Sequence, residues 1–339
     1  MNDGSKKPKG IPVTKKQIMA DLRRIGLKRG DHVAVTLSLK SIGFVIGGPN
    51  AFIDALLDVV GPEGTIMMNT FTKNFRASAI PIDYVFDKST TVPATGLVPT
   101  VFIKRKGVVR SRHPISSVAA IGKLSEYLTM DHDEKANDHL PYEKLAKIGG
   151  KYLAIGLGNR LVAIRHEAQR RADYFDLLPA LCGVRYRNAE GETKLFIRNR
   201  IPCMRNLHTI VPKIEHKSLL RRGKIGNAPS IFVPADKLIE ALSTLLKEKP
   251  ELTLCDNCFC LYCRNLERKK NLYPKIENPK IFQKSRLVRT VLLFRLKYVL
   301  KRYHSISTGN SSLKKPKSNS FVRVAKELVA RFIQKILEH

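Results

Sequence analysis

Residues 151–169 read KYLAIGLGNRLVAIRHEAQ, and this stretch decides how the rest of the chain is interpreted. Its first residues, KYLAI, are apolar and end at a glycine, which is typical of a short buried strand. A loop with two glycines follows, and the helix-like run after it carries four polar residues: Arg165, His166, Glu167 and Gln169. An open α/β sheet gathers its chemistry at the carboxyl ends of its strands, where a histidine can move a proton near neutral pH. The alternative is a structural histidine beside an ion pair.

The chain has 339 residues, which predicts either two domains or one large α/β domain with an appendage. Its hydrophobic content of 43% is enough for a sizeable core. The net charge is +32, and residues 255–339 hold 20 Lys/Arg against 5 Asp/Glu. Such a basic surface favours anionic partners, including phosphorylated cofactors, anionic lipid and nucleic acid.

Composition also favours a cytoplasmic protein. The polar start, MNDGSKKPKG, does not fit a signal peptide, and the sequence has no apolar run long enough for a transmembrane helix. Six cysteines without an export signal favour a reducing compartment over a disulfide framework. Residues 1–12 are rich in Lys, Gly and Pro, and we expect them to be disordered.

The chain then predicts a helix, a strand, a second helix and a second strand. Thr14 is a suitable N-cap for the first helix, which Gly26 ends. The apolar runs 32–37 and 65–71 are typical of strands, and a helix with one apolar face lies between them over residues 50–59. This order is a βαβ unit, which requires a parallel pair of strands with a right-handed crossover.

The loop that follows the first predicted strand, residues 38–49, combines two serines and a lysine with three glycines. Backbone amides and the helix dipole at such a helix start favour a phosphate or pyrophosphate. The glycine spacing fits neither a P-loop nor a dinucleotide fingerprint, so a plain turn is at least as good an interpretation.

Three further segments precede the central stretch. Residues 73–95 are long and irregular, which is typical of a binding lid or of disorder. Arg112 and His113 precede a proline, so the backbone should be extended there and both side chains should project. The acidic segment 130–139, MDHDEKANDH, is interpreted as mobile.

Five motifs follow one another in a distinctive order: GDHVAVTLSLKSIGFVIGG, ALLDVVGPEGTIMMNTFT, RSRHPISSVAAIG, LPYEKLAKIGGKYLAIGLG and the run around His166. Together with GKIGNAPSIFV at 223–233, they resemble the aminoglycoside 3-N-acetyltransferase family of acetyl-CoA-dependent antibiotic N-acetyltransferases. The resemblance covers roughly residues 15–254. It implies a three-layer α/β/α sandwich over 13–254, distinct from the GNAT acetyltransferase fold. It also implies transfer of acetyl from acetyl-CoA to an amine of an amino sugar, with no acyl-enzyme, as in antibiotic resistance.

The resemblance also gives individual residues roles. His166 matches the general base, which must remove a proton before the amine can attack a thioester. Thr70 matches a hydrogen-bond donor for the anionic thioester oxygen. The residues expected along acetyl-CoA are Ser38, Lys40, Ser41, Ile42, Gly43, Arg112 and His113. Those expected to bind the amino-sugar acceptor are Asn69, Glu167 and Gln169.

Several positions depart from the family pattern. Thr36 stands where His is frequent, Asn69 where Pro is common, Thr100 where Glu is usual, and Gln169 where the family has Glu after its histidine. His166 therefore lacks two expected acidic partners. A chain of net charge +32 is also poorly suited to a polycationic antibiotic, so we expect an endogenous amino sugar. The alternative function is a catalytically inactive relative that binds a sugar or lipid carrier, or a membrane-surface scaffold.

The end of the chain divides into two parts, after a predicted hairpin at 184–199 and a predicted amphipathic helix at 235–247. Residues 255–272 are rich in cysteine: Cys255, Cys258, Cys260 and Cys263. Two Cys-x-x-Cys pairs suggest zinc, but only one residue separates them, so a thiol-rich helix start is the alternative.

Residues 273–339 form a basic tail. Two amphipathic basic stretches, 285–303 and 321–337, predict helices that bind an anionic membrane surface or pack as a lid on the main domain. The sequence contains no nucleic-acid motif and no tryptophan, so we predict no specific nucleic-acid partner.

Overall fold

The computed structural model describes residues 11–174, 181–199, 209–214, 219–255 and 260–270. The chain divides into two compact units, residues 1–272 and 273–339. The second unit, with both predicted membrane-binding stretches, lies outside the described residues, and so do the start of the chain and Cys258. No helix of the described part combines the length and the apolar composition that a membrane crossing requires.

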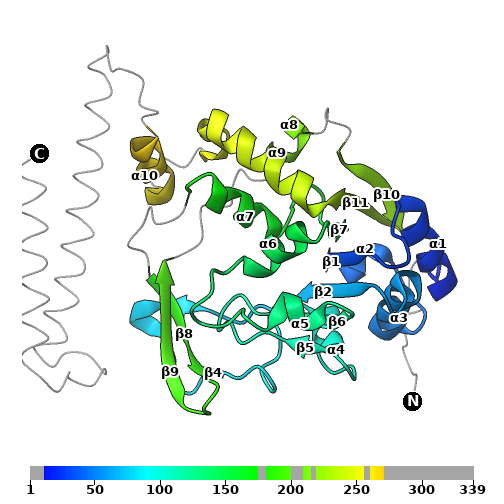
Figure 1. The fold of residues 1–339 in the computed structure, drawn as a ribbon, viewed down its shortest axis with the longest axis horizontal. Coiled ribbons are helices and arrows are strands. Elements are labelled where there is room, and N and C mark those ends of the chain that lie inside the picture. The colour runs from blue at the N-terminus through cyan, green and yellow to red at the C-terminus, as the bar shows by residue number, and fades with distance from the viewer. Residues whose placement is uncertain (1–10, 175–180, 200–208, 215–218, 256–259, 271–339) are drawn as a thin grey trace, which may run out of the picture. The chain divides into compact units, whose positions relative to one another are not determined.

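A seven-stranded mixed sheet forms the centre of the first unit, in the order β10-β11-β7-β1-β2-β6-β5 (Figure 1). Its strands are β1 (His32–Leu37), β2 (Thr65–Asn69), β5 (Val109–Arg110), β6 (Val118–Gly122), β7 (Lys151–Ile155), β10 (Arg221–Ile225) and β11 (Ala228–Pro234). β1 lies between β2 and β7 and pairs in parallel with both. The predicted βαβ unit is therefore confirmed, and KYLAI is a buried strand as predicted. The remaining strand pairs of this sheet are antiparallel.

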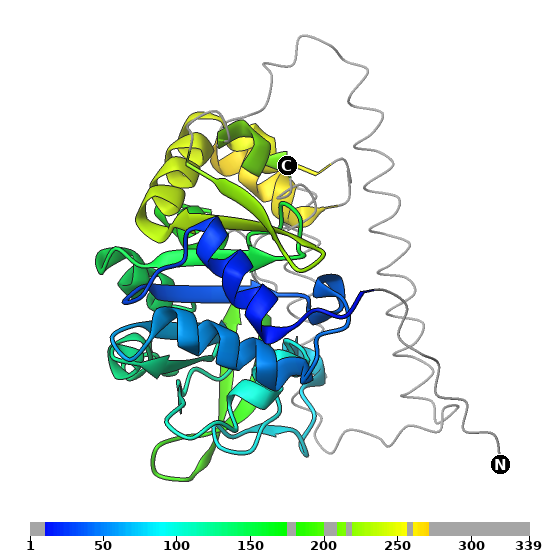
Figure 2. The ribbon, with the colours of Figure 1, turned by 90° about the vertical axis from the view of Figure 1, so that its right-hand side faces the viewer.

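Helices cover both faces of the sheet, so the predicted three-layer sandwich is confirmed. One face carries α1 (Lys15–Ile25), α3 (Gly48–Val60) and α4 (Leu97–Phe102). The other carries α5 (Ser125–Thr129), α6 (Leu140–Lys147), α7 (Ile164–Arg171) and α9 (Ala235–Glu248). In Figure 2, α1 and α3 lie in front of the sheet.

Alternating side chains of the strands supply the two cores. Val33 and Val35 of β1 pack with α1 and α3, whereas Ala34 between them packs with α6 and α9. This period of two is expected for a strand that is buried on both faces. The helices fit the same logic, because Ile18, Leu22 and Ile25 form the buried side of α1. Thr14 caps α1 in a full capping box, and Gly26 ends it in the left-handed conformation at φ 114°, as predicted.

A second, smaller sheet was not predicted. The segment 73–95, interpreted as a lid or as disordered, contains β3 (Phe75–Arg76), a 3-10 turn (Ala77–Ala79) and β4 (Val85–Phe86). β8 (Leu181–Arg187) pairs with β3 and β4 and also with β9 (Thr193–Asn199), its partner in the predicted hairpin. Strands of two residues leave almost no periodic signal in a sequence, so only the hairpin could be found.

Shorter elements complete the unit. α2 (Leu39–Ile42) follows β1 directly, and α8 (Val211–Ile214) packs near α9. After α9, a 3-10 turn (Pro250–Thr253) leads toward α10 (Leu261–Lys269). Buried residues of α10 belong to the same core cluster as α7 and α9.

The loops after β1 and β7 touch at Gly156, and this contact is testable. Gly156 has φ 67°, and a Cβ there would overlap the Ser41 side chain, whereas Gly158 has φ 56° and nothing within 4 Å of such a Cβ. Both Ala substitutions carry the left-handed backbone cost of about 1–2 kcal/mol. Gly156→Ala adds overpacking of about 1–3 kcal/mol. Urea unfolding should therefore show Gly156→Ala to be clearly less stable than Gly158→Ala, and equal losses would contradict the close contact.

Candidate active site at the carboxyl ends of the parallel strands

The carboxyl ends of β7, β1 and β2 lie side by side, because the three strands are parallel neighbours. Ser38 follows β1, and its amide donates to the Ile155 carbonyl at the end of β7 (3.0 Å). The Ser41 hydroxyl lies 2.9 Å from Ser38 Oγ and 3.3 Å from the Gly156 carbonyl. The two glycine loops that the sequence singled out separately thus meet at one edge of the sheet.

A pocket of about 570 Å³ opens beside this edge. Its lining includes three of the residues expected along the cofactor, Ser38, Lys40 and Gly43, and the start of α3. Thr95 and the first turn of α4 form another wall, and the Thr95 hydroxyl donates to the Asn69 carbonyl (2.7 Å). The pocket therefore spans from the end of β1 to the end of β2. Ile42 is a correction: its side chain is fully buried in the core under the loop.

His166 lies on α7 and is almost fully buried. Its Nδ1 atom lies 2.6 Å from Gln169 Oε1, and its ring stacks on that of His139 with centroids 5.3 Å apart. With Gln169 presenting its carbonyl oxygen, Nδ1 carries the proton and Nε2 keeps its lone pair. Burial, and to a smaller extent the charge of Arg165, lower the pKa of His166 to about 3, although the Gln169 hydrogen bond acts in the opposite direction. His166 is therefore neutral at ordinary pH.

The chain enters α7 through a strained turn. Ala163, the residue before the helix, has φ 66° and ψ −59°, and Ile164 N donates to Val162 O across it (2.9 Å). Such a γ-turn is rare for a residue with a side chain and is typical of functional sites. The Tyr152 hydroxyl holds the turn by donating to the Val162 carbonyl (2.9 Å). The orientation of α7, and with it His166, is thus linked to β7.

Two buried hydrogen bonds lie near this edge, one between β7 and β1 and the other between α6 and β2. The Tyr152 hydroxyl contacts Thr36 Oγ1 (2.7 Å), and the Tyr142 hydroxyl of α6 donates to Asn69 Oδ1 (2.8 Å). Among the described residues, Asn69 Nδ2 and Gln169 Nε2 are buried without a hydrogen-bond partner. A buried donor without a partner is costly, so both atoms are suited to a ligand oxygen. These are two of the three residues predicted to bind the acceptor.

The structure argues against the predicted role of Thr70 as a hydrogen-bond donor to the thioester oxygen. Its side chain is fully buried, Arg110 Nε donates to its Oγ1 (3.2 Å), and Ser117 Oγ lies 3.1 Å away. Arg110 also donates to the carbonyl oxygens of Thr70 (2.8 Å), Thr91 (2.5 Å) and Lys88 (3.3 Å). The Thr70 hydroxyl is thus occupied inside the protein, where it cannot meet an acyl oxygen. Burial lowers the pKa of Arg110 to about 10, which leaves it charged at neutral pH.

His113 is also corrected, because it does not project. It is 1% exposed, its Nδ1 accepts from the amides of Ile115 (3.3 Å) and Ser116 (3.0 Å), and its Nε2 lies 3.0 Å from Asp138 Oδ1. Asp138 is ion-paired with Arg198 of β9 as well. His113 thus ties the second sheet to the main core. Arg112 is half-exposed beside Asp133 (3.9 Å), and its predicted cofactor role stays a prediction.

The segment 130–139 was interpreted as mobile, yet it buries two histidines. His132 stacks on His113 with centroids 4.7 Å apart, and its Nδ1 contacts Ser111 Oγ (3.0 Å). His139 stacks on His166 from the other end of the segment. Burial lowers the pKa of both well below the usual value. The burial of His132 and His139 could not be predicted, because the segment is acidic overall and a histidine in a sequence does not by itself indicate burial.

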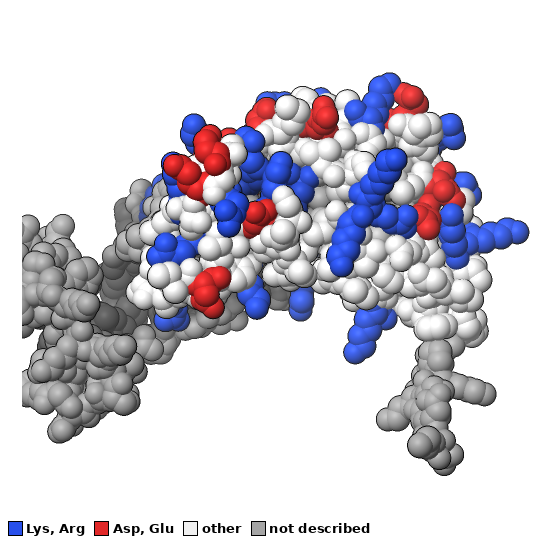
Figure 3. Space-filling view, turned by 90° about the horizontal axis from the view of Figure 1, so that it is seen from below, with Lys and Arg blue, Asp and Glu red and all other residues white. Residues whose placement is uncertain are grey.

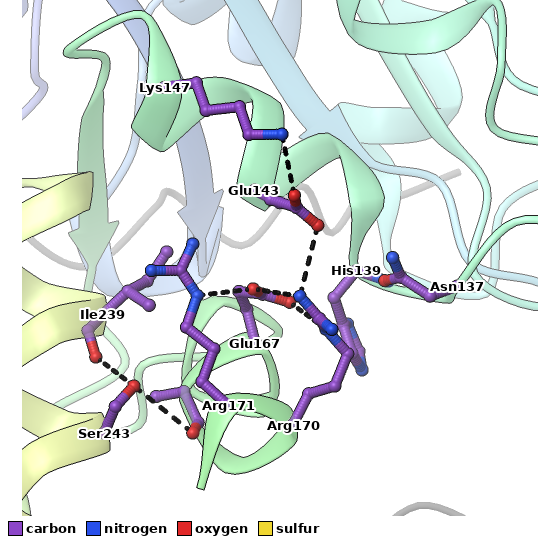
Figure 4. Close-up of polar contacts among 10 residues, drawn as sticks. Asn137, His139, Glu143, Lys147, Glu167, Arg170, Arg171, Ile239 and Ser243 are labelled. Carbon is purple, nitrogen blue, oxygen red and sulfur yellow. Dashed lines mark hydrogen bonds and ion pairs between the residues drawn. The ribbon is translucent and has the colours of Figure 1, made fainter.

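Glu167 is a further correction. Its side chain is fully buried, and its oxygens accept from Arg170 Nε and Nη2 and from Arg171 Nε, each at 2.8 Å. Arg170 reaches on to Glu143, which pairs with Lys147 (Figure 4). Both carboxylate oxygens are therefore committed to arginines, which argues against the predicted acceptor-binding role. Glu167 fixes the last turn of α7 instead.

The cysteine-rich segment lies apart from this site, at the end of the described chain. The Sγ atoms of Cys255, Cys260 and Cys263 all lie within 4.8 Å of one another. They form no disulfide.

Comparison with known proteins agrees with this geometry. The family model described as aminoglycoside 3-N-acetyltransferase matches residues 35–247. The chain belongs to this family. The match contains both glycine loops, the pocket and α7, and it ends within α9.

Individual family members are similar at moderate identity. The aminoglycoside N(3)-acetyltransferase VII of Streptomyces paromomycinus is 33% identical over 180 residues, which cover 48% of this chain and 62% of that protein. A type III enzyme of Serratia marcescens is 28% identical over 69% of this chain and 97% of its own length. The crystal structure of aminoglycoside acetyltransferase AAC(3)-Xa aligns with a TM-score of 0.60 at 28% identity, over 70% of this chain and 93% of that one.

The four buried histidines predict acid sensitivity. Burial lowers the pKa of His113 and His166 to about 3 and of His132 and His139 well below 6.5, so the unfolded chain binds more protons. Stability is therefore full above about pH 6.5 and falls as pH drops toward 3, by up to about 1.4 kcal/mol per pH unit for each histidine. Urea unfolding between pH 8 and 5 measures this. A flat profile through this range would show that the histidines are not buried as neutral groups.

Proposed function

We propose that this chain transfers an acetyl group from acetyl-CoA to an amine of an amino sugar, with His166 as the general base. The observation that carries the proposal is the hydrogen bond between His166 Nδ1 and Gln169 Oε1, which leaves Nε2 unprotonated. No described residue bonds to Nε2, so it is open to a substrate proton. Family membership and the shared edge of β7, β1 and β2 support the same reading.

The pocket beside β1 suits the phosphates of acetyl-CoA. Lys40 supplies a positive charge on its wall, and α3 begins there with Gly48 and Pro49. The start of this 13-residue helix presents the positive end of its dipole, although the Gly48 amide donates to the Val45 carbonyl (2.9 Å) and Pro49 has no N–H. Ser38 and Gly43 bring the chain close to the ligand without bulky side chains. Bound there, acetyl-CoA supplies the activated acyl group.

For this acetyl transfer the protein has to position the amine against the thioester and accept a proton. The amine nitrogen attacks the thioester carbon, a C–N bond forms, and the C–S bond breaks to release the CoA thiolate. The proton lost by the nitrogen passes to His166 Nε2. No acyl-enzyme is proposed, because the described cysteines lie in β8 and around the start of α10 rather than at the ends of β7, β1 and β2.

The acceptor is proposed to be neutral or anionic overall. Gln169 replaces the carboxylate that the family pattern places beside the histidine, and Glu167 is bound to arginines. Gln169 Nε2 and Asn69 Nδ2 remain as buried donors for hydroxyl or carbonyl oxygens of the sugar. A polycationic aminoglycoside needs acidic contacts that these groups do not provide. An amino sugar carried on a nucleotide or lipid phosphate fits the net charge of +32 better.

The tail adds a proposal that rests on sequence alone. Its two basic amphipathic stretches would hold the enzyme at an anionic membrane surface. On the face of the described unit shown in Figure 3, Lys and Arg are separated by uncharged surface rather than joined in one patch. On this face the cations therefore offer no continuous track for the phosphates of a nucleic acid.

The first experiment measures acetyl-CoA turnover with amino sugars, including nucleotide-linked ones and kanamycin. We expect His166→Ala to lower kcat/KM by about 10²- to 10⁴-fold, the usual contribution of a general base. His32→Ala is the matched control, because His32 lies at the opposite, amino end of β1. Calorimetry of CoA binding to each variant separates catalysis from cofactor binding. Turnover that His166→Ala leaves unchanged would refute the base. A chain that binds CoA but acetylates no amine would instead support the inactive relative.

Gln169→Glu provides a second test through the pH profile. A carboxylate beside Nδ1 raises the pKa of His166. The wild-type rate should show no acid limb from this group near neutral pH, because its pKa is about 3. In Gln169→Glu the rate should gain an acid limb at higher pH and rise about tenfold on the plateau, since a stronger base accepts the proton more readily. Gln169→Met, which lacks the acceptor and the charge, should lose rate without moving the limb. Identical profiles for wild type and Gln169→Glu would contradict the assignment.

A further inference from the structure

Three cysteines meet where the described chain ends, at the junction between the 3-10 turn Pro250–Thr253 and α10. Cys255 follows the turn, while Cys260 and Cys263 lie at the start of α10. Cys255 Sγ and Cys263 Sγ are 3.6 Å apart, and the Cys255 amide also points at Cys263 Sγ (3.4 Å). All three sulfur atoms lie within 4.8 Å of one another.

We propose that Cys255, Cys260 and Cys263 bind one zinc ion, which fastens α10 to the ends of α7 and α9. Zinc binds thiolates tetrahedrally at about 2.3 Å, so two of its sulfur ligands lie about 3.8 Å apart. The observed 3.6 Å between Cys255 and Cys263 is close to that separation. It is well beyond the S–S bond of about 2.05 Å that a disulfide would need.

The surroundings favour a structural ion over a reactive thiol pair. Cys263 is 3% exposed, and Cys255 and Cys260 pack against the main core cluster. Cys255 and Cys260 are partly exposed, but all three sulfur atoms converge beside the core, which fits the closed ligand set of a structural zinc site.

The contacts of α10 show what the ion would hold. The Tyr262 hydroxyl donates to the Tyr174 carbonyl (2.7 Å), just beyond α7, and Leu266 is fully buried. The Tyr174 hydroxyl in turn donates to the carbonyls of Leu246 in α9 (3.0 Å) and Pro250 (3.2 Å). Outside the cluster, Lys269 pairs with Asp173 (2.7 Å). A nine-residue helix is marginal alone, so an ion at its start would stabilise both the helix and its attachment.

Metal analysis tests the proposal on the full chain, purified under reducing conditions without chelator. We expect about one zinc per chain, and cobalt(II) in its place should give thiolate charge-transfer bands and the intense visible bands of tetrahedral coordination. Cys255→Ser and Cys263→Ser should each lose the zinc and the cobalt spectrum. Cys182→Ser, in β8 and far along the chain, should keep both. Cys258 lies outside the described residues, and Cys258→Ser shows whether it is a further ligand.

Hydrogen exchange supplies a readout that does not depend on enzyme activity. Removing zinc with a chelator should speed amide exchange in residues 261–270 and leave the strands of the central sheet unchanged. The wild-type chain needs no substitution for this comparison. The proposal is overturned if the reduced chain binds neither zinc nor cobalt(II). It is equally overturned if both single variants retain the metal, or if mass spectrometry finds a Cys255–Cys263 disulfide in the cytoplasmic protein.

Discussion

β1 pairs in parallel with both of its neighbours, and this pairing is the constraint on which the site depends. Parallel strands end at the same edge of a sheet, so residues more than 100 positions apart in sequence become neighbours there. The contact between Ser41 and Gly156 is the direct result. The crossover from β1 to β2 places α3 on one face of the sheet, whereas α7, which follows β7, lies on the other face. The pocket and the histidine therefore come from different faces of one sheet.

Burial sets the electrostatics of the site more than charge does. The chain is strongly basic, yet the two side chains that contact the His166 ring, Gln169 and His139, are neutral, and the charge of Arg165 is the smaller influence on its pKa. Its pKa falls chiefly because the charged form would lose water that nothing replaces. Replacing a carboxylate with Gln169 keeps the ring in the same tautomer but gives up the stabilisation of its charged form. A carboxylate partner usually both orients a histidine and makes it a stronger base, whereas Gln169 only orients His166.

Long-range arrangement could be predicted where a repeating pattern or a cap supported it. Thr14 and Gly26 marked the ends of the first helix, and two apolar runs with a helix between them predicted the βαβ unit. The order of motifs predicted the three-layer sandwich. Individual side chains were harder. Thr70, His113 and Glu167 were assigned to ligands from their place after a strand or on α7, but each bonds to protein partners. Arg110 and Asp138 belong to segments whose packing has no local sequence signal, whereas Arg170 and Arg171 lie three and four residues after Glu167, a helical spacing that the sequence does show. Gln169 could be predicted as a site residue because it stands where the family pattern has a glutamate.

Arg110 holds the segment 73–95 by a particular kind of contact. Its guanidinium donates hydrogen bonds to the carbonyl oxygens of Lys88 and Thr91. The Arg110 Cζ atom also lies 5.2 Å from the centroid of the Phe86 ring. Every residue has a carbonyl oxygen, so the exposed Lys88 side chain can change while this contact is kept. Thr91 differs, because its hydroxyl also accepts from the Asp87 amide (2.8 Å). The course of the segment thus depends on one buried arginine and one threonine rather than on the side chain at position 88.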